Sequence, residues 1–99
     1  MIEAKVEFGH QDVIVPYNRN NNRLADARFN GASVEALRKL GAEKGYKLVG
    51  ANQQGYNLFF VQSSENTPAV TTADILWHPD AIGSFYPASF FKEHKFVKE

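Results

Sequence analysis

Few residues in this 99-residue sequence have a type and spacing suited to chemistry. Three histidines (His10, His78 and His94) raise a metal hypothesis, and Asp80 follows His78 by two residues. Metal-binding helices typically carry two histidines three or four residues apart, and no pair here has that spacing. We therefore predict no metal site, and keep His10, His78 and Asp80 as weak candidates that the fold would have to gather.

Nucleophilic catalysis has little support in the sequence. No serine stands in the strained glycine-flanked turn that exposes a hydrolase nucleophile. Asn52 and Asn57 flank an expected turn, and we predict that they bond open backbone groups there, with substrate contact as the second interpretation.

The composition limits the class of protein. A length of 99 residues predicts that residues 1–99 form one small domain or a fragment of one, and a hydrophobic content of 43% predicts that it is globular. Eleven basic residues balance eleven acidic ones, so charge gives no reason to expect nucleic acid or an anionic membrane as partner. There is no cysteine, no signal peptide and no apolar run long enough to cross a bilayer, so we expect a cytoplasmic protein.

The N-terminal part predicts two strands. Alternating apolar residues favour a half-buried strand over residues 2–8, and a β-favouring run follows at 12–17, where Pro16 places the end at a sheet edge. We expect the two runs to pair as a hairpin through residues 9–11. The Asn-rich segment 18–23 then predicts a solvated loop.

The central block contains the main helix, expected over residues 33–44. Ser33 is a suitable N-cap, and Gly45 suits the left-handed position after the last turn. Gly41 inside a helix costs about 1 kcal/mol relative to alanine, so we expect it to allow close approach to a sheet. Glu35 and Lys39 are four residues apart and predict an ion pair on the solvated side.

A β-hairpin follows, with strands at 46–51 and 56–62 around a turn at 52–55. The second strand is apolar on both faces, with Leu58 and Phe60 on one side and Phe59 and Val61 on the other. Such a strand is typically central in a sheet that is covered on both sides. We therefore expect it to have a second neighbour besides 46–51, from this chain or from another.

The remaining chain predicts a linker over 63–72 and an aromatic tail over 73–99. Thr72 is expected to cap a short turn that Pro79 stops, and Pro87 to begin a short helix running to about His94. We predict that the tail aromatics pack in the core; filling a pocket or meeting a partner are the alternatives.

Residues 2–62 resemble the C-terminal part of FkbM-like, class I methyltransferase-like bacterial proteins. The resemblance is carried by Ile2-Glu3, Phe8-Gly9, Val15-Pro16-Tyr17-Asn18, Gly31-Ala32-Ser33, Lys44-Gly45-Tyr46, Leu48-Val49-Gly50, Asn52, Gly55 and Asn57, and Phe59-Phe60-Val61. Ala4-Lys5 departs from the family's Tyr-Asn, and the tail after Ser63 is not covered. The resemblance implies an α/β fold that is a partial Rossmann-like unit: 33–44 as the last helix, 46–51 as the sixth strand and 56–62 as the seventh, inserted antiparallel beside a fifth strand ending at Ile2-Glu3.

The resemblance also limits the expected activity. It implies that S-adenosylmethionine is held by the first half of the parent fold, through a glycine-rich loop and an acidic residue. Neither feature is present in these 99 residues, so we expect no cofactor in this chain and no catalysis by it alone. Glu3 is the one weak catalytic candidate, because in the resembled proteins it ends a strand at the edge where α/β folds keep their active sites.

The sequence therefore leaves two alternative functions. The first is a C-terminal portion of a methyltransferase-like enzyme. The second is a self-standing α/β interaction module that assembles through sheet edges. In both cases an unpaired strand edge, or the apolar face with Phe59 and Val61, predicts a homo-oligomer.

Overall fold

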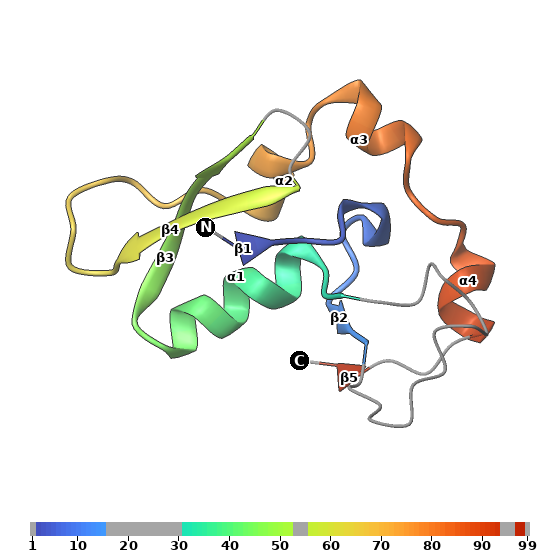
Figure 1. The fold of residues 1–99 in the computed structure, drawn as a ribbon, viewed down its shortest axis with the longest axis horizontal. Helices are drawn as coiled ribbons and strands as arrows, with labels where there is room; N and C mark the ends of the chain where they lie inside the picture. The colour runs from blue at the N-terminus through green and yellow to red at the C-terminus, as the bar shows by residue number, and fades with distance from the viewer. Residues whose placement is uncertain (1, 16–30, 53–55, 94–96, 99) are drawn as a thin grey trace.

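A computed structural model describes residues 2–15, 31–52, 56–93 and 97–98 (Figure 1). The fold is small and mixes helices with strands. Its elements are β1 (Ile2–Glu3), a 3-10 helix (Val6–Phe8), β2 (Val13–Ile14), α1 (Val34–Glu43), β3 (Tyr46–Ala51), β4 (Asn57–Gln62), α2 (Thr72–Ile75), α3 (Pro79–Gly83), α4 (Ala88–Glu93) and β5 (Val97–Lys98). The expected loop at 18–23, most of the 52–55 turn, His94 and Phe96 lie outside the described residues.

Helix α1 begins and ends as its sequence predicts. Ser33 is the N-cap, and its Oγ accepts a hydrogen bond from Ala36 N at 3.1 Å. Gly45 follows the C-terminal turn with a φ of 88°, a conformation that glycine adopts without steric cost. Gly41 faces the sheet, and a Cβ there would meet the ring of Phe60, so the expected close approach is confirmed.

The main sheet has three strands in the order β1-β4-β3, and both pairings are antiparallel. The hairpin of β3 and β4 matches the prediction, with an irregularity between Leu48 and Gly50. The expected second neighbour of β4 is β1, which pairs Ile2 with Leu58 and Glu3 with Asn57. Strand β4 is therefore central, as its apolar residues predicted, but the expected cover on both sides of the sheet is wrong, because Phe59 is 41% exposed.

The prediction of a strand over residues 2–8 is wrong after Glu3. The chain leaves the sheet at Ala4 and Lys5 and forms the 3-10 helix, in which Val6 and Phe8 are both buried. These two side chains enter different hydrophobic clusters. An alternating pattern does not distinguish a strand from such a bend. It indicates that every second residue is buried, but it does not indicate the direction in which the chain runs.

The expected hairpin between the two N-terminal runs is also wrong. Strand β2 pairs with β5 at the far end of the chain, and Ile14 bridges to Ala32. The backbone of Val15 donates to Gly31 O at 2.9 Å. Residues 13–15 therefore pair with β5 and with the segment just before α1 rather than with residues 2–8.

The core consists of two hydrophobic clusters. The main cluster lies between α1, α2 and the sheet; its buried members are Ala4, Val6, Val34, Leu48, Leu58, Ile75 and Leu76. A second cluster joins Phe8 and Val13 to Phe90 of α4, with Tyr86 and Phe91 packed against it. Figure 1 shows the sheet and α1 at one end of the molecule and α3 and α4 toward the other.

The tail forms short helices whose boundaries differ slightly from the prediction. Thr71, not Thr72, caps α2, because Thr71 and Asp74 exchange hydrogen bonds in a capping box. Pro79 begins α3 instead of only stopping the previous turn. The predicted helix after Pro87 is present as α4.

The segment expected to be a linker lies along the outer edge of β3. Val70 N donates to Leu48 O at 2.9 Å, and Ser63 N donates to Gly45 O at 2.9 Å. Lys47 Nζ also donates to the carbonyl of Glu65. Val70 therefore bonds to a carbonyl that β3 would otherwise expose at this edge, whereas the bond from Ser63 to Gly45 continues the pairing of β3 with β4. In the part of the chain that the structure describes, no helix is long and apolar enough to cross a membrane.

Candidate functional site

A polar hollow of about 370 Å³ lies at the C-terminal end of β1. It contains Glu3, the candidate from the sequence, together with two further charged residues and one aromatic residue. Its lining consists of Glu3, Ala4, Lys5, Glu7, Gly31 and Tyr56. The hollow therefore lies where β1 ends and β4 begins, between Glu3 and Tyr56.

Backbone hydrogen bonds fix the walls of this hollow. Ala4 N donates to Tyr56 O at 2.7 Å, which joins the end of β1 to the start of β4. Lys5 N donates to Ala32 O at 2.8 Å, which brings the segment before α1 alongside. On the other side, Tyr86 N donates to Glu7 O at 2.8 Å. Three separate parts of the chain thus hold the charged residues in place.

The residues around the hollow suit the binding of a polar group. The Lys5 ammonium lies 5.6 Å from the centre of the Tyr86 ring, a distance typical of a cation–π contact. Glu3 and Glu7 offer carboxylate oxygens that accept hydrogen bonds, and among the described residues neither has an ion-pair partner. Two carboxylates against one ammonium give the hollow a net negative charge, which favours a ligand group that donates hydrogen bonds.

The metal candidates are not brought to this hollow. The ring of His10 packs edge-on against Phe85, with 6.0 Å between ring centres. His78 packs against Trp77 at 5.2 Å, and Asp80 lies in α3. Within residues 2–15, 31–52, 56–93 and 97–98, no three His, Asp or Glu residues are grouped as metal ligands.

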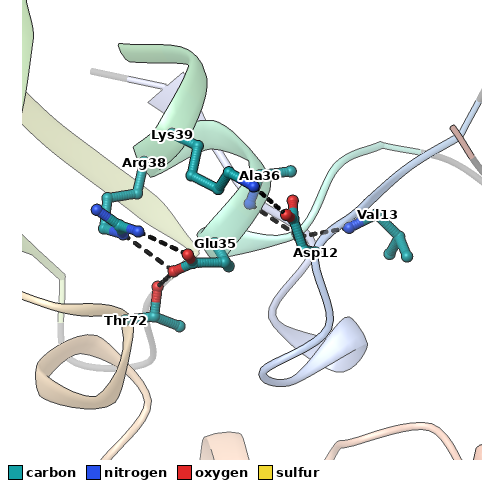
Figure 2. Close-up of polar contacts among 8 residues, drawn as sticks. Asp12, Val13, Glu35, Ala36, Arg38, Lys39 and Thr72 are labelled. Carbon is teal, nitrogen blue, oxygen red and sulfur yellow. Dashed lines mark hydrogen bonds and ion pairs between the residues drawn. The ribbon is translucent and has the colours of Figure 1, made fainter. Parts of the chain in front are cut away.

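A polar network anchors the first turns of α1 (Figure 2). Glu35 accepts two hydrogen bonds from Arg38, at 2.9 and 2.6 Å, and one from Thr72 Oγ1 at 2.6 Å. The hydrogen bonds from Arg38, followed by that from Thr72, lower the pKa of Glu35 from 4.5 to about 2 against the opposing effect of burial. This carboxylate therefore links α1 to α2.

The other half of the network links α1 to β2. Lys39 Nζ lies 2.6 Å from Asp12 Oδ2, and Ser33 Oγ accepts a hydrogen bond from Val13 N at 3.1 Å (Figure 2). The predicted ion pair between Glu35 and Lys39 is therefore wrong. Glu35 forms its ion pair with Arg38, and Lys39 forms its ion pair with Asp12. The other carboxylate oxygen of Asp12 is buried and has no hydrogen-bond partner among the described residues.

Sequence reasoning identified Glu3 but missed Lys5, Glu7 and Tyr56. The first two were placed in a strand, where Lys5 and Glu7 would have continued a solvated face. Tyr56 stands 53 positions after Glu3 and joins it only through the register of β1 on β4. No spacing in the sequence records that register, because it depends on contacts between distant segments.

Comparisons with protein-family models, with curated proteins and with solved structures found no match to this chain.

Proposed function

We propose that this chain is the C-terminal portion of an FkbM-like, class I methyltransferase-like protein and is not catalytic by itself. The observation that carries the proposal is the strand order β1-β4-β3, with β4 antiparallel to both neighbours. It is the arrangement that the resemblance implies for the fifth, seventh and sixth strands of that fold. Helix α1 connects to β3 as the last helix would connect to the sixth strand.

The two edges of the sheet support the addition of a further strand next to β1 but not next to β3. On the outer edge of β3, Val70 N already donates to Leu48 O. On β1, the bond from Ala4 N to Tyr56 O makes Ala4 a hydrogen-bonded pair with Tyr56. Because such pairs alternate along antiparallel strands, the N–H and C=O of Glu3 point away from β4, toward the outer edge of the sheet.

An apolar hollow beside this edge supports the same continuation. It measures about 340 Å³ and lies between α1 and the sheet. Its lining consists of Ile2, Leu37, Leu40, Gly41, Lys44, Tyr46 and Phe60. A further strand beside β1, with the helix that covers it, would bury these side chains and gain the free energy of removing them from water.

The glycines support placing the cofactor in another part of the parent fold. Gly31 and Gly45 have positive φ values at loop and helix boundaries, and Gly41 packs against Phe60. Each thus has a structural reason that does not involve a nucleoside or phosphate. S-adenosylmethionine would be held by a separate half of the protein, and Glu3, Glu7 and Tyr56 would face the acceptor from this half.

The first experiment measures S-adenosylmethionine binding to the chain by isothermal titration calorimetry. We expect no heat of binding, and measurable binding would contradict this division of the fold. The coding sequence upstream of the Met1 codon provides the second test. A glycine-rich cofactor motif in the same reading frame is expected there. Its absence would favour the self-standing interaction module instead.

If that upstream segment exists, co-expression with the chain gives a direct structural test. We expect the two polypeptides to co-purify and S-adenosylmethionine to bind the complex. Ile2→Asp places a charge at the proposed junction and should abolish co-purification. Ile82→Asp is the matched control, because Ile82 is exposed on α3, outside the sheet and the apolar hollow, and should leave the complex intact.

A further inference from the structure

We propose that the sheet face opposite α1 binds the same face of a second copy of this chain and forms a two-fold symmetric dimer. We call this surface the open face, and define it by Glu3, Lys47, Asn57, Phe59 and Val61. These residues share one side of the sheet, because Glu3 pairs with Asn57 and Lys47 with Val61, and alternate residues of β4 point the same way. The proposal does not rest on the methyltransferase-like assignment; in the dimer, Glu3 would pair with the other copy rather than face an acceptor.

The middle of the open face is apolar and exposed. Phe59 is 41% exposed and Val61 is partly exposed. Leu58, the neighbour of Phe59 on the opposite side of β4, is 0% exposed, and it packs with Val34 of α1 in the main cluster. The covering helices thus lie on one side of the sheet, while a phenylalanine at the centre of the other side remains in contact with water.

The charges on the open face are arranged for self-recognition. Glu3 on β1 lies level with Asn57, two residues before Phe59, and Lys47 on β3 lies level with Val61, two residues after it. Phe59 is therefore midway along the diagonal between a carboxylate and an ammonium. When two such faces meet, a two-fold axis can lie in the plane between them, over Phe59 and perpendicular to this diagonal. This axis places Glu3 of each protomer opposite Lys47 of the other.

The surroundings of the two charges fit this pairing. Among the described residues Glu3 has no ion-pair partner. Lys47 Nζ donates to the backbone carbonyl of Glu65, a neutral group that leaves the charge of the ammonium uncompensated. The whole chain has a formal net charge of zero, so two copies approach without overall repulsion. A self-complementary patch closes after two copies and limits the assembly to a dimer.

Sedimentation equilibrium over a range of protein concentrations tests the dimer. We expect the native chain to dimerise reversibly, and Phe59→Glu to raise the dissociation constant by at least about tenfold, because it buries a charge at the centre of the interface. Ile82→Glu is the control, since this exposed residue lies on α3 and should leave the dissociation constant unchanged. Should Phe59→Glu prevent folding, as judged by circular dichroism, Phe59→Ser replaces it with a milder change of the same direction.

Charge exchange tests the two-fold arrangement itself. Glu3→Lys and Lys47→Glu, made singly, each bring like charges together and should weaken the dimer by about tenfold. The double variant restores opposite charges across the axis and should recover most of the native affinity. A native chain that stays monomeric at its highest soluble concentration would overturn the proposal, and so would a dimer that Phe59→Glu and Phe59→Ser leave intact. A double variant weaker than both single ones would overturn the proposed axis.

Discussion

Gly41 lies so close to the ring of Phe60 that a Cβ atom on residue 41 would stand 2.7 Å from Phe60 Cε2. This contact sets how near α1 can approach β4. The helix accepts a residue of low helical propensity here because the missing side chain allows the ring of Phe60 to pack against the helix backbone. The glycine is therefore a packing requirement of the sheet, and it can be tested as one.

Gly41→Val should destabilise the chain by about 2 kcal/mol, since an added side chain must displace the ring of Phe60. Urea denaturation measures the change in the free energy of unfolding. The control is Gly83→Val, because a Cβ at Gly83, the last residue of α3, would meet no atom within 4 Å. In a Phe60→Leu background the cost of Gly41→Val should fall, and equal costs in both backgrounds would contradict the contact.

Ser33→Ala should destabilise the chain by about 1–3 kcal/mol, because it removes the acceptor for two backbone N–H groups. The hydroxyl oxygen of Ser33 accepts from Ala36 N in α1 and from Val13 N in β2, and the residue is fully buried. Thermal or urea unfolding provides the measurement. Ser63→Ala, at an exposed position after β4, should change the stability little, and a similar loss there would argue against a specific role for Ser33.

The pH dependence of stability should include a contribution from Glu35. Its pKa is lowered to about 2, mainly by the hydrogen bonds from Arg38, so the folded state favours the ionised form. The stabilisation is therefore fully present above pH 4.5 and is lost as the pH falls from 4.5 toward 2. Because Glu35 is partly exposed and solvent screens the pair, we expect about 1 kcal/mol.

Glu35→Gln tests this assignment through urea titrations between pH 2.5 and 7. The variant should be less stable than the native chain near pH 7, and the two should converge at the acidic end. Glu43→Gln, at an exposed position in the same helix, should run parallel to the native chain. A constant gap between Glu35→Gln and the native chain across the range would show that the ionised carboxylate is not the stabilising species.

Local signals allowed α1 and the β3–β4 hairpin to be predicted. Ser33 and Gly45 mark the two ends of the helix through their own backbone preferences, and the two-sided apolar pattern of β4 implied a central strand. These features depend on residues close together in sequence. The helix and the two strands of the hairpin are therefore found in the structure with nearly the predicted boundaries.

Other parts depended on contacts that no local pattern contains. Val6 and Phe8 alternate as a strand would, but they serve two different clusters across a bend in the chain. In the candidate site, Glu3 was a candidate only because of the family resemblance, while Tyr56 reaches the hollow only through the pairing of β1 with β4. The partners of a site residue could be predicted only once that pairing was known.

The last prediction concerns the aromatic tail, part of which is buried in the second hydrophobic cluster. Phe90 of α4 is 1% exposed and lies 6.2 Å from Phe8 and 4.7 Å from Tyr86, measured between ring centres. Phe90→Ala should therefore cost about 3–5 kcal/mol, because it removes a buried ring and leaves a cavity. Urea denaturation followed by circular dichroism measures this loss.

Trp77→Ala is the control within the same tail. Trp77 is 62% exposed between α2 and α3, so its removal should change the free energy of unfolding by less than about 1 kcal/mol. The two variants separate the interpretations of the tail left open by the sequence. If Phe90→Ala folded with native stability, the tail aromatics would not be core residues, and a role in meeting a partner would become the better account of residues 73–99.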